Sequence, residues 1–277
     1  MNEVIFLLAI GLIWIIFASI QDLRSREVAN WLSFSLIIFA LGFRFFYSLF
    51  SGGDFNFFYQ GLIGLGIFFV LGNLLYYGRM FAGGDAKLMI ALGAILPLSN
   101  SLFGNFRIFF VFFLIFLFAG MFYSLTWSLV LALRNARAFR KEFFKIFVKN
   151  KKILYPVMIF GLIIMLFGFA NTLLFYFGTL FFLFPYLYIY AKAVDEACMV
   201  KKIKVSELTE GDWLYKDVKV GRKLIKASWN GLSKEDIKRI KKKHRSIVIR
   251  QGVPFVPVFL ISFLILIGYY FRISLNL

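Results

Sequence analysis

Residues 81–88 read Phe-Ala-Gly-Gly-Asp-Ala-Lys-Leu and lie between two long apolar runs of the chain. A carboxylate so close to hydrocarbon is costly unless it has a partner or a function. Asp is also favoured at helix N-termini, so capping of the following helix is an alternative interpretation of Asp85. The stretch predicts a turn between two membrane helices that carries a structurally or catalytically important acid.

The composition indicates a membrane protein. Of the 277 residues, 61% are hydrophobic and 21% aromatic, and the mean hydropathy is +0.82. Soluble proteins are typically about 45–50% apolar. The first apolar run lacks the basic start and small-residue cleavage site of a secretory leader, so we expect residues 3–20 to form a membrane span.

The apolar runs predict an all-α polytopic membrane protein with about eight transmembrane helices, since each crossing needs about 20 residues. The expected spans cover residues 3–20, 31–50, 59–77, 85–98, 106–133, 153–170, 172–190 and 254–271. We divide 153–190 near Ala170-Asn171-Thr172, because the run is too long for one crossing at about 1.5 Å per residue.

Two segments are polar. Residues 134–152 are strongly basic, with Phe at helical spacing, which favours an amphipathic helix on the membrane surface or, equally, a solvated connector. Residues 195–251 predict a small α+β domain, with short strands at 202–205 and 213–220 and a helix opened by the capping residue Ser233. The predicted organisation is a membrane domain with catalytic loops (1–194), a soluble cytoplasmic domain (195–251) and a final transmembrane helix (252–277).

The positive charge follows the predicted topology. If the N-terminus is outside, 29 of the 32 Lys and Arg residues fall in cytoplasmic segments, and the other three, Arg44, Arg107 and Arg272, lie near outer ends. This asymmetry predicts that both termini are outside and that Asp22 and Asp85 share the cytoplasmic side. The net charge of +18 then indicates contact with anionic lipid and not nucleic-acid binding.

Cysteine and histidine chemistry is nearly excluded. Cys198 and His244 are single occurrences, so no disulfide within the chain and no cysteine zinc cluster can form. His244 lies in a basic run that is typical of a solvated surface. We predict neither a metal nor a cofactor.

Asp22 and Asp85 form a candidate catalytic pair, although Asp22 alone could instead pair with Arg24 or Arg26. Two carboxylates held close together share one proton, so that one acts as general acid while the other activates a water. This is aspartic-protease chemistry. Gly83 and Gly84 would let an extended peptide backbone approach the pair, or would simply form a tight turn.

Three stretches resemble the type IV prepilin and preflagellin peptidases, membrane aspartyl proteases with a Gly-x-Gly-Asp motif. They are Asp-Leu-Arg-Ser-Arg-Glu-Val-Ala-Asn-Trp-Leu (22–32), Ala-Gly-Gly-Asp-Ala-Lys-Leu (82–88) and Gly-Val-Pro-Phe-Val-Pro (252–257). Ala82 departs from the motif, which has Gly at its first position. The resemblance implies that Asp22 and Asp85 are the catalytic dyad of an endopeptidase at the cytoplasmic membrane face.

The implied substrates are prepilin-like or archaellin precursors, which carry short basic leaders, and Glu27 is a candidate contact for that positive charge. Many bacterial members also methylate the new N-terminus and have a cysteine-rich zinc segment between early spans. This chain has no such segment, so we expect cleavage without methylation, as in an archaeal-type member.

Two other function classes stay open. An ion- or proton-coupled transporter would use Asp22 and Asp85 as ion-binding acids, although no internal repeat places an Asp-containing turn symmetrically. A membrane-anchored interaction protein would use residues 195–251 as its working part.

Overall fold

A computed structural model describes residues 2–168, 171–221, 223–229 and 231–275. The chain divides into two compact units. Unit 1 comprises Met1–Leu125 and Val253–Leu277, and unit 2 comprises Thr126–Gly252. Each unit is described by itself.

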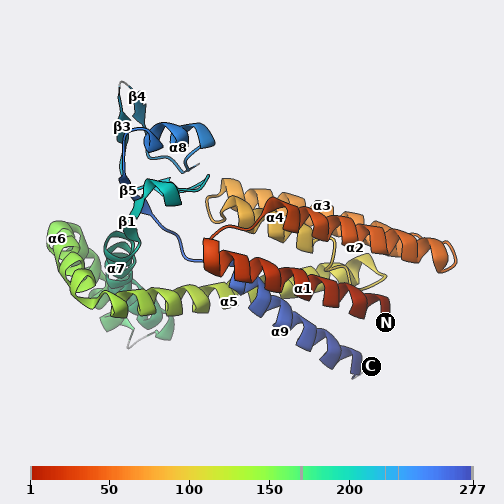
Figure 1. Ribbon diagram of the computed structural model, residues 1–277. Helices are drawn as coiled ribbons and strands as arrows, with labels where there is room; N and C mark the ends of the chain where they lie inside the picture. The colour runs from red at the N-terminus through yellow and green to blue at the C-terminus, as the bar shows by residue number, and fades with distance from the viewer. Residues whose placement is uncertain (1, 169–170, 222, 230, 276–277) are drawn as a thin grey trace. The chain divides into compact units, whose positions relative to one another are not determined.

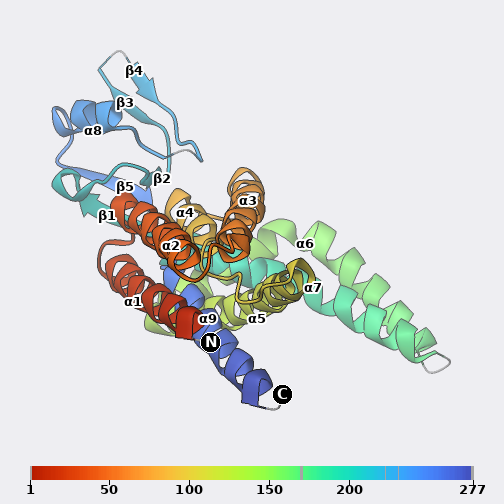
Figure 2. The same cartoon turned by 90° about the vertical axis from the view of Figure 1, so that its right-hand side faces the viewer.

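Unit 1 is a bundle of helices in which the last helix of the chain packs against the first (Figure 2). Its helices are α1 (Asn2–Ser25), α2 (Asn30–Phe50), α3 (Asn56–Tyr77), α4 (Gly83–Leu92), the first part of α5 (Leu102–Arg134) and α9 (Val256–Leu275). The short helix α4 packs on both α2 and α3.

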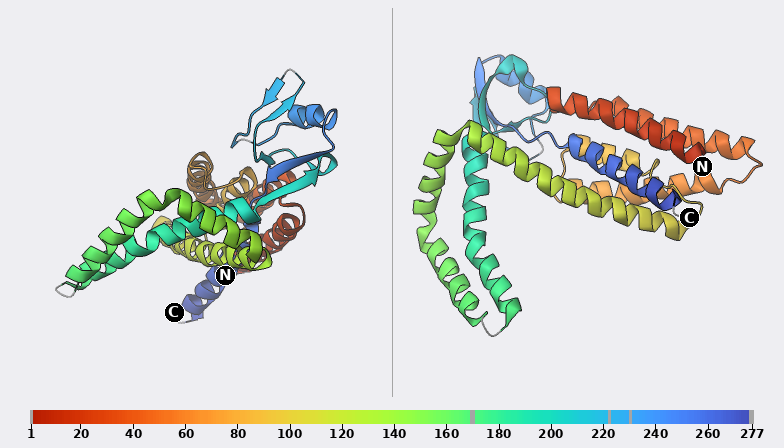
Figure 3. Two further views of the ribbon diagram at one scale, coloured as in Figure 1. Left: turned by 90° about the vertical axis from the view of Figure 1, so that its left-hand side faces the viewer. Right: turned by 90° about the horizontal axis from the view of Figure 1, so that it is seen from below.

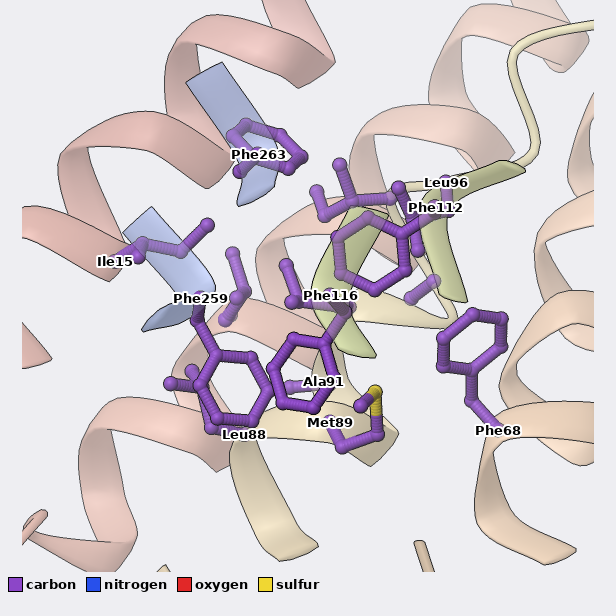
Figure 4. Close-up of a cluster of buried hydrophobic side chains, with 14 of the residues drawn as sticks. Ile15, Phe68, Leu88, Met89, Ala91, Leu96, Phe112, Phe116, Phe259 and Phe263 are labelled. Carbon is purple, nitrogen blue, oxygen red and sulfur yellow. The ribbon is translucent and has the colours of Figure 1, made fainter. Parts of the chain in front are cut away.

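Helix α4 lies in the centre of the apolar core of unit 1. The side chains of Leu88, Met89, Ala91 and Leu92 are all inaccessible to solvent. Figure 4 shows that Leu88, Met89 and Ala91 lie among aromatic rings contributed by α3, α5 and α9. The second half of α4, Leu88–Leu92, carries no polar side chain, and such a segment is stable only when it is enclosed.

The segment after α4 is not helical, yet residues 93–98 are buried. At one end, Lys87 in α4 hydrogen-bonds Asn30, the first residue of α2. At the other end, Asn56 of α3 donates to the carbonyl of Asn100 at 2.8 Å. Helix α4 and the segment behind it therefore extend from the start of α2 to the start of α3. A non-helical backbone of this kind is tolerated in membranes only where protein encloses it, and residues 93–98 are enclosed.

The predicted fourth span, 85–98, is thus helical only as far as Leu92. Gly93 and Pro97 give the physical reason, because Gly lowers helix propensity and Pro has no N–H for the helix ladder.

Unit 2 contains the end of α5 and an antiparallel pair of long helices, α6 (Ala136–Phe167) and α7 (Thr172–Cys198), which Figure 3 shows side by side. A side chain at Gly161 or Gly178 would collide with the backbone of the facing helix, so these small residues allow the close approach. Ala170, at the predicted division, lies outside the described residues, but Asn171 caps α7 by accepting the N–H of Leu173. The basic stretch 134–152 is not a separate surface helix, because α6 continues through it to Phe167.

A small α+β region follows α7 (Figure 1). Its elements are β1 (Val200–Lys204), the 3₁₀ turn η1 (Val205–Glu207), β2 (Trp213–Leu214), β3 (Val218–Val220), β4 (Lys223–Ile225), α8 (Lys234–Lys241) and β5 (Ser246–Arg250). Strand β5 pairs antiparallel with β1 on one side and β2 on the other, while β3 and β4 form a hairpin. Ile237 and Ile240 of α8 are buried with apolar side chains of the strands.

The strand predicted at 202–205 corresponds to β1, and the capping role of Ser233 is confirmed, since the Ser233 hydroxyl accepts the Asp236 N–H. The single strand predicted at 213–220 is wrong, because the chain leaves the first sheet after β2 and enters the hairpin at β3. Strands β4 and β5 were missed. Strand β5 comes directly after the basic run 238–245, and that run hid its short alternation of apolar residues.

Four side chains connect the end of α7 to the three-stranded sheet. Arg250 of β5 pairs with Asp195 at 3.3 Å and with Glu196 at 3.1 Å. The Tyr215 hydroxyl donates to Glu196 at 2.7 Å, and this hydrogen bond to a carboxylate raises the pKa of Tyr215. The network joins helix and sheet within unit 2.

The chain is a polytopic membrane protein with a small α+β region before its last helix, as predicted. Among the described residues, six helices are long and apolar enough to cross a membrane, namely α1, α2, α3, α5, α6 and α7. Helix α9 is a further, shorter apolar helix. With the interrupted crossing at α4, these correspond in order to the eight predicted spans.

The packing of α3 on α4 generates a stability prediction. A Cβ on Gly64 would overlap the Gly93 carbonyl oxygen and would lie 2.5 Å from Pro97 Cγ, whereas a Cβ on Gly66, two residues further along α3, meets nothing within 4 Å. We expect Gly64→Ala to destabilise the protein by about 1–3 kcal/mol and to lower its midpoint of thermal unfolding in nanodiscs. Gly66→Ala is the matched control, and equal midpoints for the two variants would contradict this packing.

Candidate active site

Asp22 lies in the last turn of α1, where its side chain is only 6% exposed. Its Oδ2 accepts the backbone N–H of Val256 at 2.9 Å. Val256 is the first residue of α9, and the first N–H groups of a helix have no partner within the helix. The Asp22 carboxylate therefore satisfies the N-terminus of α9, and this hydrogen bond fixes the orientation of the carboxylate.

The chain turns directly after Asp22. Arg26 has a positive φ of 58°, and its N–H donates to the Asp22 carbonyl at 2.8 Å. Of the two arginines considered as partners of Asp22, Arg24 is exposed, whereas the charge of Arg26 acts on Asp22. The turn thus brings a cation back towards the carboxylate.

Asp85 lies in the first turn of α4 and is half-buried. Its Oδ2 accepts the N–H of Ala82 at 3.3 Å. Ala82 is the N-cap residue of α4, so Asp85 is not the cap itself but reaches back to it, as the third residue of a capping box does. The capping interpretation of Asp85 is therefore supported in this modified form, and it does not exclude a catalytic use of the carboxylate.

The two aspartate segments, residues 22–32 (the first) and 81–88 (the second), contact each other directly. Lys87 Nζ donates to Asn30 Oδ1 at 2.6 Å. A Cβ built on Gly84 would lie 3.5 Å from the Val28 Cβ. The charge of Asp22 also acts on Asp85, so residues that are far apart in the sequence are brought into one electrostatic environment.

Phe81 anchors the second segment to the start of α9. Its buried ring packs on the rings of Phe116, Phe255 and Phe259, with centroid separations of 5.8, 6.0 and 6.0 Å. Phe255 directly precedes Val256, whose N–H binds Asp22. One short stretch at the entry to α9 therefore positions both aspartate segments.

This role of residues 255–256 was not predicted, and neither was Tyr123 of α5. The Tyr123 hydroxyl oxygen is buried, and the charges of Asp22 and Arg26 both act on it. Tyr123 is one of 13 tyrosines in the chain, and only the packing of α5 distinguishes it. The Pro254-Phe255-Val256-Pro257 sequence did carry a signal, through its resemblance to the family.

The other predicted site residues lie around the pair. Gly83 and Gly84 open α4, and a Cβ at either would meet only ordinary van der Waals neighbours, 3.8 Å from Tyr76 and 3.5 Å from Val28. Glu27 is exposed in the loop between α1 and α2. Among the described residues, no group of three or more His, Cys, Asp or Glu side chains is arranged to hold a metal ion.

Comparison with known proteins agrees with these features. Residues 9–125 match the type IV leader peptidase family, and the match includes both aspartates. The match supports the family resemblance predicted from the stretches 22–32 and 82–88, whereas the stretch 252–257 lies outside it. No solved structure matches the chain.

Three similar proteins are preflagellin peptidases. The protein of Methanocaldococcus jannaschii is 31% identical over 133 residues, which cover 46% of this chain and 56% of that protein. The protein of Methanococcus maripaludis is 35% identical over 88 residues (32% of this chain, 37% of that protein), and the protein of Methanococcus voltae is 33% identical over 89 residues (32% and 37%). The chain therefore spans from about a third to just over half of these relatives.

The contact between the two segments can be tested by cross-linking. A Cβ–Cβ separation of 3.5 Å between positions 28 and 84 falls within the range of about 3.5–4.5 Å that a disulfide requires. In a Cys198→Ser background, we expect Val28→Cys with Gly84→Cys to form a disulfide on mild oxidation in membranes, measured by gel shift. Val28→Cys with Gly83→Cys is the matched control, and equal yields for the two pairs would contradict the described approach.

Proposed function

We propose that this chain is a membrane-embedded aspartyl endopeptidase that removes the basic leader from preflagellin or prepilin-like precursors. Asp22 and Asp85 are its catalytic dyad. One observation carries the proposal: the family match spans both aspartates, in a structure where the charge of one acts on the other. The preflagellin peptidases among the relatives support this choice of substrate.

The dyad works through one shared proton. The ionised carboxylate takes a proton from a water molecule, and the resulting hydroxide attacks the carbonyl carbon of the scissile peptide bond. The protonated carboxyl group hydrogen-bonds the carbonyl oxygen and stabilises the tetrahedral intermediate. Proton transfer to the leaving nitrogen then breaks the C–N bond. The two acids titrate as a coupled pair.

The surroundings of Asp22 suit this role. The Val256 N–H holds one carboxylate oxygen in place, so little reorganisation is needed when a water binds. Arg26 and Tyr123 lie within electrostatic range of the same carboxylate. They affect how readily Asp22 carries a negative charge, but neither is itself one of the two catalytic acids.

The substrate reaches the pair past Gly83 and Gly84, which present backbone without side chains. Glu27, exposed within the first aspartate segment, contributes negative charge that attracts a basic leader. Cleavage proceeds without methylation of the new N-terminus. The enzyme acts on the cytoplasmic membrane face, with both termini outside and residues 195–251 forming a cytoplasmic domain between the membrane domain 1–194 and the final helix 252–277.

Replacement of either aspartate tests the proposal. We expect Asp22→Asn and Asp85→Asn, each made separately, to slow cleavage of a preflagellin precursor in membranes by about 10²–10⁴-fold, because each variant loses one acid of the pair. Asp54→Asn is the matched control: this exposed acid in the turn before α3 accepts the Asn56 N–H through an oxygen that Asn retains.

Cleavage by either site variant at the wild-type rate would overturn the dyad. The alternative, a transporter that uses Asp22 and Asp85 as ion-binding acids, predicts no cleavage by any variant and a proton or cation flux that the same substitutions abolish.

Gly84→Ala separates catalysis from folding. The substituted Cβ would meet Val28 at an ordinary 3.5 Å, and Ala favours a helix over Gly by up to about 1 kcal/mol, so the midpoint of thermal unfolding should not fall. If the substrate backbone needs this space, cleavage should fall by at least about tenfold. Gly66→Ala is the control on a helix that is not part of the site, and wild-type cleavage by Gly84→Ala would rule out the backbone-approach role.

A further inference from the structure

Arg44 of α2 is completely buried in unit 1. Its guanidinium donates four hydrogen bonds, all to backbone carbonyl oxygens. They are Nε to Ala94 at 2.9 Å, Nη1 to Phe57 at 2.9 Å, Nη2 to Ile95 at 3.2 Å and Nη2 to Pro97 at 2.6 Å. The guanidinium carbon also lies 4.3 Å from the centroid of the Phe57 ring.

Such a cation is unusual in a membrane bundle. Burial of an ionised group costs several kcal/mol unless hydrogen bonds and opposite charge compensate it. Three of the four carbonyls belong to the segment directly behind α4, where the helix macrodipole places partial negative charge. The last carbonyls of α4 accept the N–H groups of residues 93–96, so Arg44 does not cap the helix itself. It satisfies the carbonyls of the buried non-helical segment that directly follows α4 and fixes that segment in place.

Helix α4 connects the segment that Arg44 holds to the candidate active site. Asp85 lies in its first turn, and Ala94 lies just beyond its last residue, Leu92. At about 1.5 Å per residue, the two positions are separated by about 14 Å. Arg44 is therefore too far from Asp85 to touch the reacting atoms, but the two are joined by a short helix whose second half is buried in the core.

We propose that Arg44 is a positioning residue that fixes α4 along its axis and so holds the Asp85 segment against the Asp22 segment. As a statement about catalysis, this rests on the proposed function. Two contacts hold the N-terminal end of α4, the Phe81 ring cluster and the Lys87–Asn30 hydrogen bond. The guanidinium fork is the corresponding anchor at the other end, and loss of it lets α4 slide or fray.

The chain offers graded variants of this anchor. Arg44→Gln removes the charge and most of the donors, while Arg44→Lys keeps the charge but loses the planar fork. Gly61→Ala leaves Arg44 in place but would put a Cβ 2.5 Å from its Cδ and 2.9 Å from its Nε, so it displaces the guanidinium. Arg107→Gln is the matched control, an exposed arginine near the start of α5.

The experiment has two readouts in the Cys198→Ser background. The first is the rate of disulfide formation between Val28→Cys and Gly84→Cys, which reports the approach of the two segments without any catalysis. The second, with Val28 and Gly84 unchanged, is cleavage of a preflagellin precursor. We expect Arg44→Gln, Arg44→Lys and Gly61→Ala to slow cross-linking several-fold and to lower kcat by about tenfold to a hundredfold with little change in KM, while Arg107→Gln matches the parent.

The outcomes are distinguishable. If the parent protein does not cleave the precursor, the proposed function fails, but cross-linking still tests the position of α4. If Arg44→Gln does not fold, as judged by size exclusion and thermal unfolding, Arg44→Lys and Gly61→Ala decide the question. Folded variants that cross-link at the parent rate overturn the positioning role, and so does a kcat loss without a change in cross-linking.

Discussion

The Asp22 carboxylate accepts the N–H of Val256, a residue 234 positions later in the sequence. A hydrogen bond to a charged group is worth about 1.5–3 kcal/mol. This one joins the end of the first helix to the start of the last. The neighbouring Phe255 packs on Phe81 beside the second aspartate segment, so the same short stretch holds both acids. The arrangement of the candidate site depends on this closure of unit 1 by α9.

The two ends of α4 are held by different side chains, Asp85 at the N-terminus and Arg44 beyond the C-terminus. At its N-terminus, Asp85 bonds the Ala82 N–H and stays close enough to Asp22 for their charges to interact. Just beyond its C-terminus, the Arg44 guanidinium donates hydrogen bonds to the carbonyls of residues 94, 95 and 97. Without these bonds the carbonyls would be buried without partners, which is costly inside a membrane protein. A full-length helix would need no such arginine.

Much of this arrangement could be predicted from the sequence. The apolar runs indicated a polytopic membrane protein, and the two aspartate segments indicated the family. Gly93 and Pro97 indicated a break in the fourth predicted span, but the sequence did not indicate that the helix ends as early as Leu92. Val256, Phe81 and Tyr123 could not be assigned roles, because these depend on how α9 and α5 pack. Arg44 was counted only as a charge near an outer end, yet a single arginine within an apolar run is itself a signal of a buried partner.

The central claim is that Asp22 and Asp85 act as one unit. The most direct test compares the cleavage rate of the double variant, Asp22→Asn with Asp85→Asn, with the rates of the two single variants. Residues of one catalytic unit are strongly non-additive. The account predicts that the double variant cleaves no more slowly than the slower single variant. Losses that multiply, as for two independent sites, would contradict it.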